Sequence, residues 1–195
     1  MLNWIGPAKL VLRSPDGSLD DALAMVDILS MLGIRGHIAG GFLRDLHHRV
    51  EPKDIDIFIS GDVDKQRVKT VFETAGYAGT TVVQPQLCEY LSFCDVQYVM
   101  EFTKTGARPI QVIVLKEGMR FEDIINRLDL GLCQIGIDGV GDLYYSDAYW
   151  QDEMAQTFTI IRKEHPRDIL RSTKRYNRIA QRYPGWALVG GTMDG

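Results

Sequence analysis

The sequence predicts an α+β fold, in which helices flank a mixed sheet and a basic helix follows near the C-terminus. Strand-like and helix-like segments succeed one another without the strict alternation that a parallel α/β sheet requires. A chain of 195 residues with 45% hydrophobic residues is long enough to bury one core. We therefore expect one domain over residues 1–162 and a helix with a mobile tail over residues 163–195.

Apolar periodicity and turn residues define the elements of the first half. Ser18 precedes a run of apolar residues at helical spacing, and Gly33 is typical of a helix end. Gly40 and Gly41 separate a short apolar run from the next helix. In order, we expect a helix over 18–33, a strand over 36–39, a helix over 41–48, a strand over 54–59, and a helix from Asp62 or Asp64 to Ala75.

The second half is richer in strands. Short apolar segments alternate with turn residues, as is typical of a sheet. Pro166 occupies the favoured first turn of a long helix, and Pro184-Gly185 ends it. In order, we expect strands over 80–83, 88–93, 96–102 and 110–115, a helix over 121–127, strands over 132–137, 143–148 and 158–162, and a helix over 166–182.

Two aspartates at the start of one expected strand are the strongest functional signal. Asp54 and Asp56 share one face of the sheet, while Ile55 and Ile57 point into the core. Two neighbouring carboxylates repel each other unless a cation lies between them. The alternative is a solvated strand edge with two surface acids. We expect both to bind Mg²⁺ or Mn²⁺, because these ions prefer hard oxygen ligands.

The glycine pair supplies a second signal. Gly40 and Gly41 expose backbone N–H groups where a helix begins, and such groups bind phosphate. A tight turn that binds nothing needs the same backbone. Because a metal site and a phosphate site occur together, the sequence indicates a nucleoside triphosphate with magnesium.

Charge and hydropathy exclude several classes of protein. The net charge is −4, but Arg162 to Arg182 holds eight basic and two acidic residues, so this segment carries +6 and the rest −10. This distribution argues against general nucleic-acid coating and permits a local phosphate contact. No apolar run approaches the ~20 residues of a membrane span, and no secretory signal is visible. We expect a soluble cytoplasmic protein without a membrane partner.

Cysteine and histidine give no clear metal pattern. The three cysteines lack a Cys-x-x-Cys pair and are interpreted as buried free thiols in a reducing compartment. Adjacent His47 and His48 cannot share one helix face, so the histidines are interpreted as surface residues rather than a zinc site. The residues concerned are Cys88, Cys94, Cys133, His37, His47, His48 and His165.

The run Gly40-Gly41-x-x-Arg44-Asp45, followed by Lys53-Asp54-Ile55-Asp56, resembles the head domain of the polymerase-β nucleotidyltransferase superfamily. The closest likeness is to the branch of CCA-adding enzymes and bacterial poly(A) polymerases. The resemblance implies a nucleotidyltransferase-like sheet, catalytic metal binding by Asp54 and Asp56, and nucleotide binding by the glycine turn. For Arg44, a salt bridge to a nearby acid is equally compatible, and Asp45 is expected to order the site. The nucleotide-binding residues implied here are Gly40, Gly41, Arg44, Asp45 and Lys53.

Two later segments resemble the same enzymes in the same order. The segment from Asn126 to Leu132 is similar to the one that reads the ribose, which implies nucleotide contacts by Arg127 and Asp129. A helix-ending cap is the alternative for Asp129. The segment from His165 to Arg171 is similar to the start of the first neck helix. Its basic stripe is either a solvated face or an acceptor-binding surface, formed by Arg167, Arg171, Lys174, Arg175 and Arg178.

The chain also departs from this pattern. Leu128 replaces one arginine of the ribose segment, and Gln111 stands where the superfamily often places a third carboxylate. The Gln111 strand also looks like small nucleotidyltransferase-like proteins of phages and large viruses. Because little sequence follows Arg182, we expect no full CCA-adding function.

The function that the resemblance implies is metal-dependent transfer of a nucleotidyl group from a nucleoside triphosphate to a hydroxyl. An RNA 3′ end, such as that of tRNA, is one candidate acceptor. Two alternatives remain open. One is a toxin or counter-defence factor that nucleotidylates tRNA or protein, and the other is a catalytically weak nucleotide-binding module.

Overall fold

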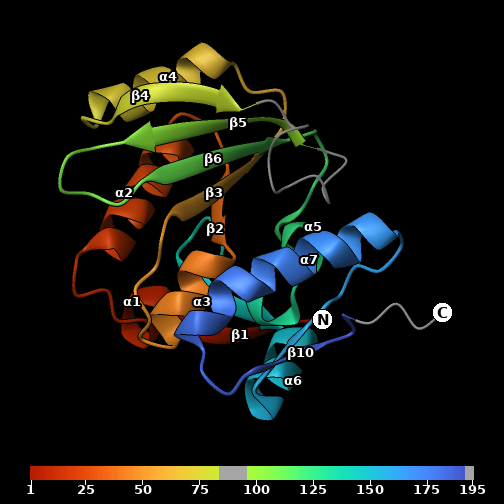
Figure 1. The fold of residues 1–195 in the computed structure, drawn as a ribbon. Helices are drawn as coiled ribbons and strands as arrows, with labels where there is room; N and C mark the ends of the chain where they lie inside the picture. The colour runs from red at the N-terminus through yellow and green to blue at the C-terminus, as the bar shows by residue number, and fades with distance from the viewer. Residues whose placement is uncertain (84–95, 192–195) are drawn as a thin grey trace.

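The computed structural model describes residues 1–83 and 96–191, and Figure 1 shows their fold. The predicted strand over 88–93, Cys88 and Cys94, and the end of the C-terminal tail lie outside these residues. The helices are α1 (Ala8–Val11), α2 (Ser18–Met31), α3 (Gly41–His47), α4 (Lys65–Thr74), α5 (Phe121–Asn126), α6 (Asp147–Ala155) and α7 (Pro166–Ile179). The strands are β1 (Leu2–Pro7), β2 (Gly36–Ala39), β3 (Ile55–Ser60), β4 (Ala78–Val83), β5 (Val96–Thr103), β6 (Ile110–Leu115), β7 (Ile135–Ile137), β8 (Asp142–Ser146), β9 (Thr157–Thr159) and β10 (Ala187–Val189).

Eight strands form one sheet in the order β1-β8-β7-β2-β3-β6-β5-β4. The pair β3 and β6 is parallel, and the other neighbouring pairs are antiparallel. The sheet is mixed and helices flank it, so the predicted α+β class is confirmed. Most expected elements of the first half are present within a few residues, because they depend on local periodicity and on turn residues.

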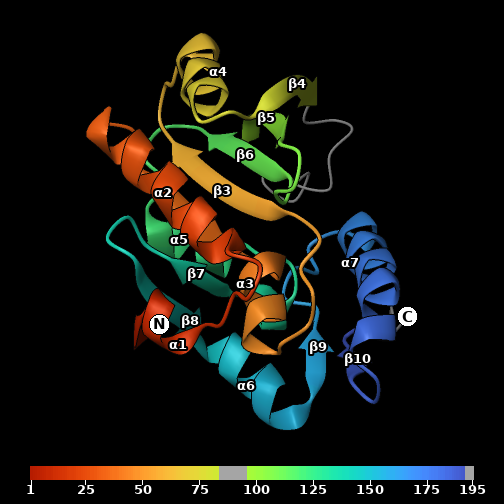
Figure 2. The ribbon, with the colours of Figure 1, turned by 90° about the vertical axis from the view of Figure 1, so that its left-hand side faces the viewer.

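Helices cover both faces of the sheet. A Cβ atom on Gly36 would lie 3.4–3.6 Å from Val26 and Leu29 of α2 and from Ile57, so α2 packs on the face that Ile57 occupies. A Cβ atom on Gly136 would meet α5 on the opposite face. Figure 2 shows α2 and α7 at opposite sides of the molecule. Because strand side chains alternate, Asp56 lies on the face opposite α2.

The start of α2 differs from the prediction in its cap. Gly17 is the N-cap residue, with a φ of 76°, and Ser18 is the first residue of the helix. The side chains of Ser14 and Asp16 accept hydrogen bonds from the backbone N–H groups of Leu19 and Ser18, at 2.9 and 3.1 Å. The side chains of Asp16 and Ser14, which precede α2, therefore satisfy two of its first backbone N–H groups.

Three predicted strands are wrong in part. The strand over 143–148 ends at Ser146, because the Ser146 side chain accepts a hydrogen bond from Tyr149 N and starts α6. The strand over 132–137 begins only at Ile135, since η3 (Gly131–Cys133) is a 3-10 turn. A Cβ atom on Gly131 would lie 2.5 Å from Oδ2 of Asp152 on α6, so this close approach requires glycine. The strand over 158–162 is β9, which ends at Thr159.

The C-terminal segment returns to the body of the fold. After α7 and η4 (Ala180–Arg182), β10 pairs in parallel with β9 in a separate two-stranded sheet. The rings of Phe158, Tyr183 and Trp186 pack against one another at centroid distances of 5.3–5.8 Å. Within residues 1–83 and 96–191, no helix has the length and apolar character needed to cross a membrane.

Candidate active site

The glycine turn lies directly beside one of the two aspartates. Gly40 connects β2 to α3 with a φ of 90° and a ψ of −140°, a conformation that side chains rarely adopt. A Cβ atom on Gly40 would lie 3.8 Å from Oδ2 of Asp56. The structure therefore brings together the backbone turn and the acidic strand that the sequence analysis singled out separately.

The two aspartates differ in exposure. Asp56 is the second residue of β3 and is 5% exposed, whereas Asp54 directly precedes the strand and its side chain is 27% exposed. Nζ of Lys53 lies 3.4 Å from Oδ2 of Asp54, and the Lys53 side chain is 81% exposed. Carboxylate oxygens are the ligands that Mg²⁺ and Mn²⁺ prefer, so buried Asp56 and partly exposed Asp54 are the candidates to hold such an ion.

A further carboxylate lies in the same row of the sheet. Gln111 of β6 is paired with Asp56 on one side and with Glu101 of β5 on the other. Its Nε2 donates a hydrogen bond to Oε1 of Glu101 at 3.2 Å. The sequence analysis missed Glu101, which is one strand beyond the expected position. The signal was present in β5, where the less buried Glu101 and Thr103 alternate with the buried Met100 and Phe102.

Arg44 and Asp45 are each only 2% exposed, and they face the C-terminal segment. Nε of Arg44 donates to Oδ1 of Asp45 at 2.7 Å, and its Nη1 donates to Sγ of Cys133 at 3.1 Å. Asp45 also accepts hydrogen bonds from the Tyr183 hydroxyl and from Nη1 of Arg182, both at 2.7 Å. The salt bridge that was the alternative for Arg44 is therefore present.

Burial and polar neighbours change the pKa values of Arg44 and Tyr183. Burial alone would lower the pKa of Arg44, but its charged and polar neighbours, Asp45 among them, outweigh that effect and raise the pKa above its usual value. Burial raises the pKa of Tyr183, so its hydroxyl remains a donor at neutral pH. The geometry thus makes Arg44, Asp45 and Tyr183 a buried link between α3 and the chain that follows α7.

Asp129 forms a second link to α7. Its carboxylate is 4% exposed and accepts hydrogen bonds from Oγ of Ser172 at 2.9 Å and from Nη1 of Arg175 at 3.0 Å. Arg127 is partly buried, and its Nη1 lies 3.6 Å from Sδ of Met119. The segment predicted to read the ribose therefore contacts the helix predicted to bind the acceptor.

The basic residues of α7 do not form one uniform surface. Arg175 turns toward Asp129, and Nη1 of Arg171 lies 3.6 Å from Oδ1 of Asp168. Arg167, Lys174 and Arg178 are exposed. The stripe thus combines residues that fix the helix with residues at the surface.

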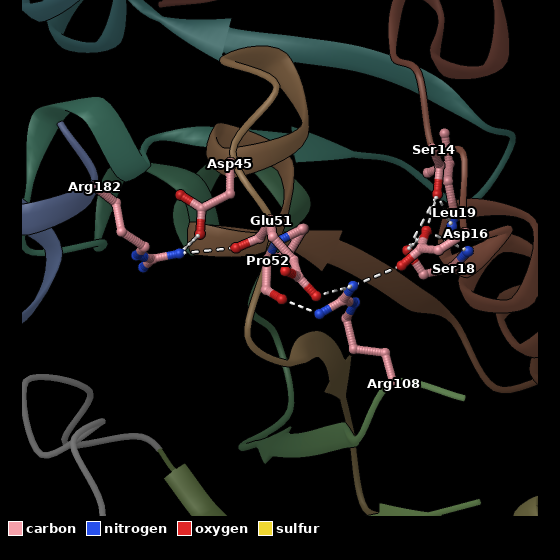
Figure 3. Close-up of polar contacts among 9 residues, drawn as sticks. All are labelled: Ser14, Asp16, Ser18, Leu19, Asp45, Glu51, Pro52, Arg108 and Arg182. Carbon is pink, nitrogen blue, oxygen red and sulfur yellow. Dashed lines mark hydrogen bonds and ion pairs between the residues drawn. The ribbon is translucent and has the colours of Figure 1, made fainter. Parts of the chain in front are cut away.

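Two arginines hold the loop that leads into β3, as Figure 3 shows. Nη1 of Arg182 donates to the Glu51 carbonyl at 3.0 Å, while Nη1 of Arg108 donates to the Pro52 carbonyl. Nη2 of Arg108 also donates to Oδ2 of Asp16 at 2.6 Å. Because these contacts come from opposite sides, they fix the backbone just before Asp54. The sequence analysis missed this role of Arg108 and Arg182, which no local pattern indicates.

The fold is similar to solved structures of CCA-adding enzymes. The chain matches the Bacillus stearothermophilus CCA-adding enzyme in complex with CTP at a TM-score of 0.63 and 16% identity, over 92% of this chain and 42% of that one. It matches the Thermotoga maritima CCA-adding enzyme complexed with tRNA at 0.58 and 14%, over 93% and 40%. It matches a tRNA-processing enzyme in an apo form at 0.62 and 17%, over 93% and 46%.

These similarities concern the fold. No protein-family model matches the chain, and no curated protein sequence matches it. The chain spans less than half the length of the three solved structures. With the glycine turn beside Asp56 in this sheet, the chain has the fold of a nucleotidyltransferase head domain.

Proposed function

We propose that the protein transfers a nucleotidyl group from a nucleoside triphosphate to a hydroxyl acceptor and releases pyrophosphate. The observation that carries this proposal is that the Gly40 turn lies directly beside Asp56, two residues after Asp54. This arrangement supports phosphate binding by the turn next to metal binding by the two carboxylates. It occurs in a fold whose solved examples include CCA-adding enzymes in complexes with CTP and ATP.

Asp54 and Asp56 are the residues that would hold Mg²⁺ or Mn²⁺. When bound, such an ion would lower the pKa of the attacking hydroxyl and neutralise charge on the leaving pyrophosphate. Asp56 is fixed by β3 and excluded from solvent, so its carboxylate is preorganised. Asp54 is open to solvent, which suits exchange of ion and substrate.

The remaining residues have supporting roles in this proposal. The glycine turn binds the triphosphate through the backbone N–H of Gly41, while Gly40 supplies the turn, because the N–H of Gly40 already donates to the Ile135 carbonyl at 3.0 Å. Exposed Lys53 adds positive charge beside Asp54. Arg127 and Asp129 contact the nucleotide. Because Arg44 and Asp45 are buried and bonded to each other, we propose that they position the glycine turn.

We propose an RNA 3′ end, such as that of tRNA, as the acceptor. The exposed basic residues of α7 support this choice, since they offer contacts to backbone phosphates. Residues 1–162 then form the catalytic head, and the segment from 163 onward supplies the acceptor surface. We place this activity in the cytoplasm, where the free thiol of Cys133 would remain reduced.

The test is transfer of label from each α-labelled nucleoside triphosphate to total tRNA with Mg²⁺ or Mn²⁺. The expected result is a labelled RNA product that Asp54→Ala and Asp56→Ala abolish. Equal signal from the wild type and both variants, for every nucleotide, would refute the proposal.

One observation favours a second candidate, a catalytically weak nucleotide-binding module. Gln111 holds Glu101 away from the pair of aspartates by one strand, so a third carboxylate does not stand beside Asp56 on β6. Calorimetry would then give nucleoside triphosphate binding without pyrophosphate release. The alternative of a toxin or counter-defence factor predicts instead growth arrest on expression, relieved by Asp56→Ala.

A further inference from the structure

The end of α3 and the middle of α6 bring together two imidazoles and one carboxylate that the proposed reaction does not use. His47 is the last residue of α3, His48 is its C-cap, and Glu153 belongs to α6. One ligand atom from each of these side chains lies within 4.8 Å of the other two. Adjacent residues diverge along a regular helix, but α3 ends here, so both rings face α6. His47 is exposed, as predicted, whereas the His48 side chain is only 14% exposed, so the prediction of a surface residue is wrong for His48.

His48 and Glu153 approach each other without forming a hydrogen bond. Nε2 of His48 lies 2.9 Å from Oε2 of Glu153. Both atoms are buried, and neither has a hydrogen-bond partner within the described residues. Buried polar atoms without a partner are rare in folded proteins, and an ion that binds both is one recognised explanation. The two atoms are thus placed like two ligands of one centre.

Surrounding residues fix the orientation of both rings. The Tyr149 hydroxyl, from a side chain that is 1% exposed, lies 2.6 Å from Nδ1 of His47. Metal-binding histidines almost always use their second ring nitrogen for such a contact, which leaves Nε2 for the ion. The rings of Tyr183 and Trp186 hold His48 edge-on at 5.3 and 5.1 Å. The donors therefore need little reorganisation to bind an ion.

We propose that His47, His48 and Glu153 form a site for a zinc-type transition-metal ion, with water as the fourth ligand. Two imidazoles and one carboxylate suit Zn²⁺ or Co²⁺, whereas Mg²⁺ prefers oxygen ligands alone. The exposed side chain of His47 gives the ion a way in. The bound ion would join α6 to the helix that follows the Gly40 turn, and so would stabilise the fold around that turn.

The test uses the full chain after treatment with a chelator, titrated with Co²⁺ in the presence of excess Mg²⁺. Mg²⁺ occupies oxygen-ligand sites, so the visible absorption of Co²⁺ reports the nitrogen-containing site. We expect a four-coordinate Co²⁺ spectrum that saturates at one equivalent and disappears when Zn²⁺ is added. This readout does not depend on nucleotidyl transfer, so it stands or falls separately from the proposed function.

Variants locate the site. Glu153→Gln and His47→Ala should each weaken Co²⁺ binding by more than the ~10- to 100-fold that loss of an outer-shell partner causes, and Tyr149→Phe should weaken it by about that amount. The matched controls are Glu117→Gln and His165→Ala, which change exposed residues outside the cluster and should leave the spectrum unchanged. Zn²⁺ should raise the thermal unfolding midpoint of the wild type and of both controls, but not that of Glu153→Gln.

Two results would overturn the proposal. One is the absence of a four-coordinate Co²⁺ spectrum from the wild type. The other is a spectrum that survives in both His47→Ala and Glu153→Gln. Either result would leave His48 and Glu153 as a simple ion pair.

Discussion

The two ends of the run Gly40-Gly41-x-x-Arg44-Asp45 face different parts of the molecule. Gly40 lies against Asp56 in the candidate site, whereas Arg44 and Asp45, one turn later, contact Cys133 and Tyr183. The charged residues of this run thus have protein partners, and its glycines lie beside the acids. A residue in a functional motif can therefore serve the shape of a site without contact with the ligand.

The two ends of this run should therefore differ in what a substitution changes first, turnover or the free energy of unfolding. Substitutions at the contact between Gly40 and Asp56 should change turnover while leaving the free energy of unfolding almost unchanged. Residues in the buried link should change the free energy of unfolding first. Variants in the two regions should therefore differ in their effects on turnover and on the free energy of unfolding.

The largest effect is expected on turnover, at Asp56. Asp56→Asn keeps the volume of the side chain but removes its charge, so metal binding and several kcal/mol of transition-state stabilisation are lost. Turnover should fall by about 10³-fold or more. Steady-state pyrophosphate release measures this, and the denaturation midpoint should hardly change. Turnover close to that of the wild type would contradict the assignment of Asp56.

The next effect is expected in the buried link. Arg44→Met leaves the buried Asp45 carboxylate with Arg182 and Tyr183 alone, so the loss should lie at or below the ~3–5 kcal/mol that breaking a buried pair typically costs. Urea denaturation measures the free energy of unfolding. The double variant Arg44→Met with Asp45→Leu should recover part of the loss, because no buried charge is left unpaired. A stable Arg44→Met with reduced triphosphate affinity would instead place Arg44 among the phosphate-binding residues.

A smaller effect is expected where the loop before Asp54 is held. Arg182→Ala and Arg108→Ala each remove one contact to the carbonyls of Glu51 or Pro52. A shift of about 1 Å in a reacting group lowers turnover by up to ~100-fold, so kcat should fall without proportional loss of stability. Arg35→Ala, an exposed arginine elsewhere, is the control. Unchanged kcat in both variants would mean that the loop needs neither contact.

The smallest effect concerns acid stability. Partial burial raises the pKa of Asp16, but hydrogen bonds from Arg108, Ser18 and Ser14 lower it well below its usual value. A carboxyl with a lowered pKa in the folded state contributes stability above its unfolded pKa, near 3.8, and this contribution is lost as pH falls further. Because Asp16 is partly exposed, the contribution should be about 1 kcal/mol or less.

Thermal unfolding of Asp16→Asn and the wild type as a function of pH checks this. The wild type should be more stable at neutral pH, and the difference should shrink below about pH 4. A difference that is constant across this range would show that the Asp16 charge has no part in it.

Local signals made much of the fold predictable. The strand 110–115 agrees with β6 at both ends, and the helix cap at Asp64 and the turn at Gly40 are present, because each depends on neighbouring residues. Strand β1, helices α1 and α6, and strand β10 were missed. The start of α6 depends on the cap at Ser146 within an otherwise strand-like run. β10 exists only through its pairing with β9, so nothing local marks it.

The candidate site shows the same division. Asp54, Asp56 and Gly40 were singled out by spacing along a single stretch of chain. Arg108 and Arg182 were not, since their contacts join segments that lie far apart in the sequence. Glu101 was missed because its partner Gln111 lies on the neighbouring strand, ten residues away. Long-range contacts of this kind leave no periodic trace, and in the absence of a structure they are invisible in one sequence.

The most direct test of the central claim is anomalous diffraction from crystals of the protein with Mn²⁺ and a nucleoside triphosphate. We expect manganese within ligand distance of both Asp54 and Asp56, with the triphosphate oxygens bound to the metal and to the backbone N–H of Gly41 in the glycine turn. Manganese bound elsewhere, or a triphosphate that does not approach this edge of β3, would contradict it.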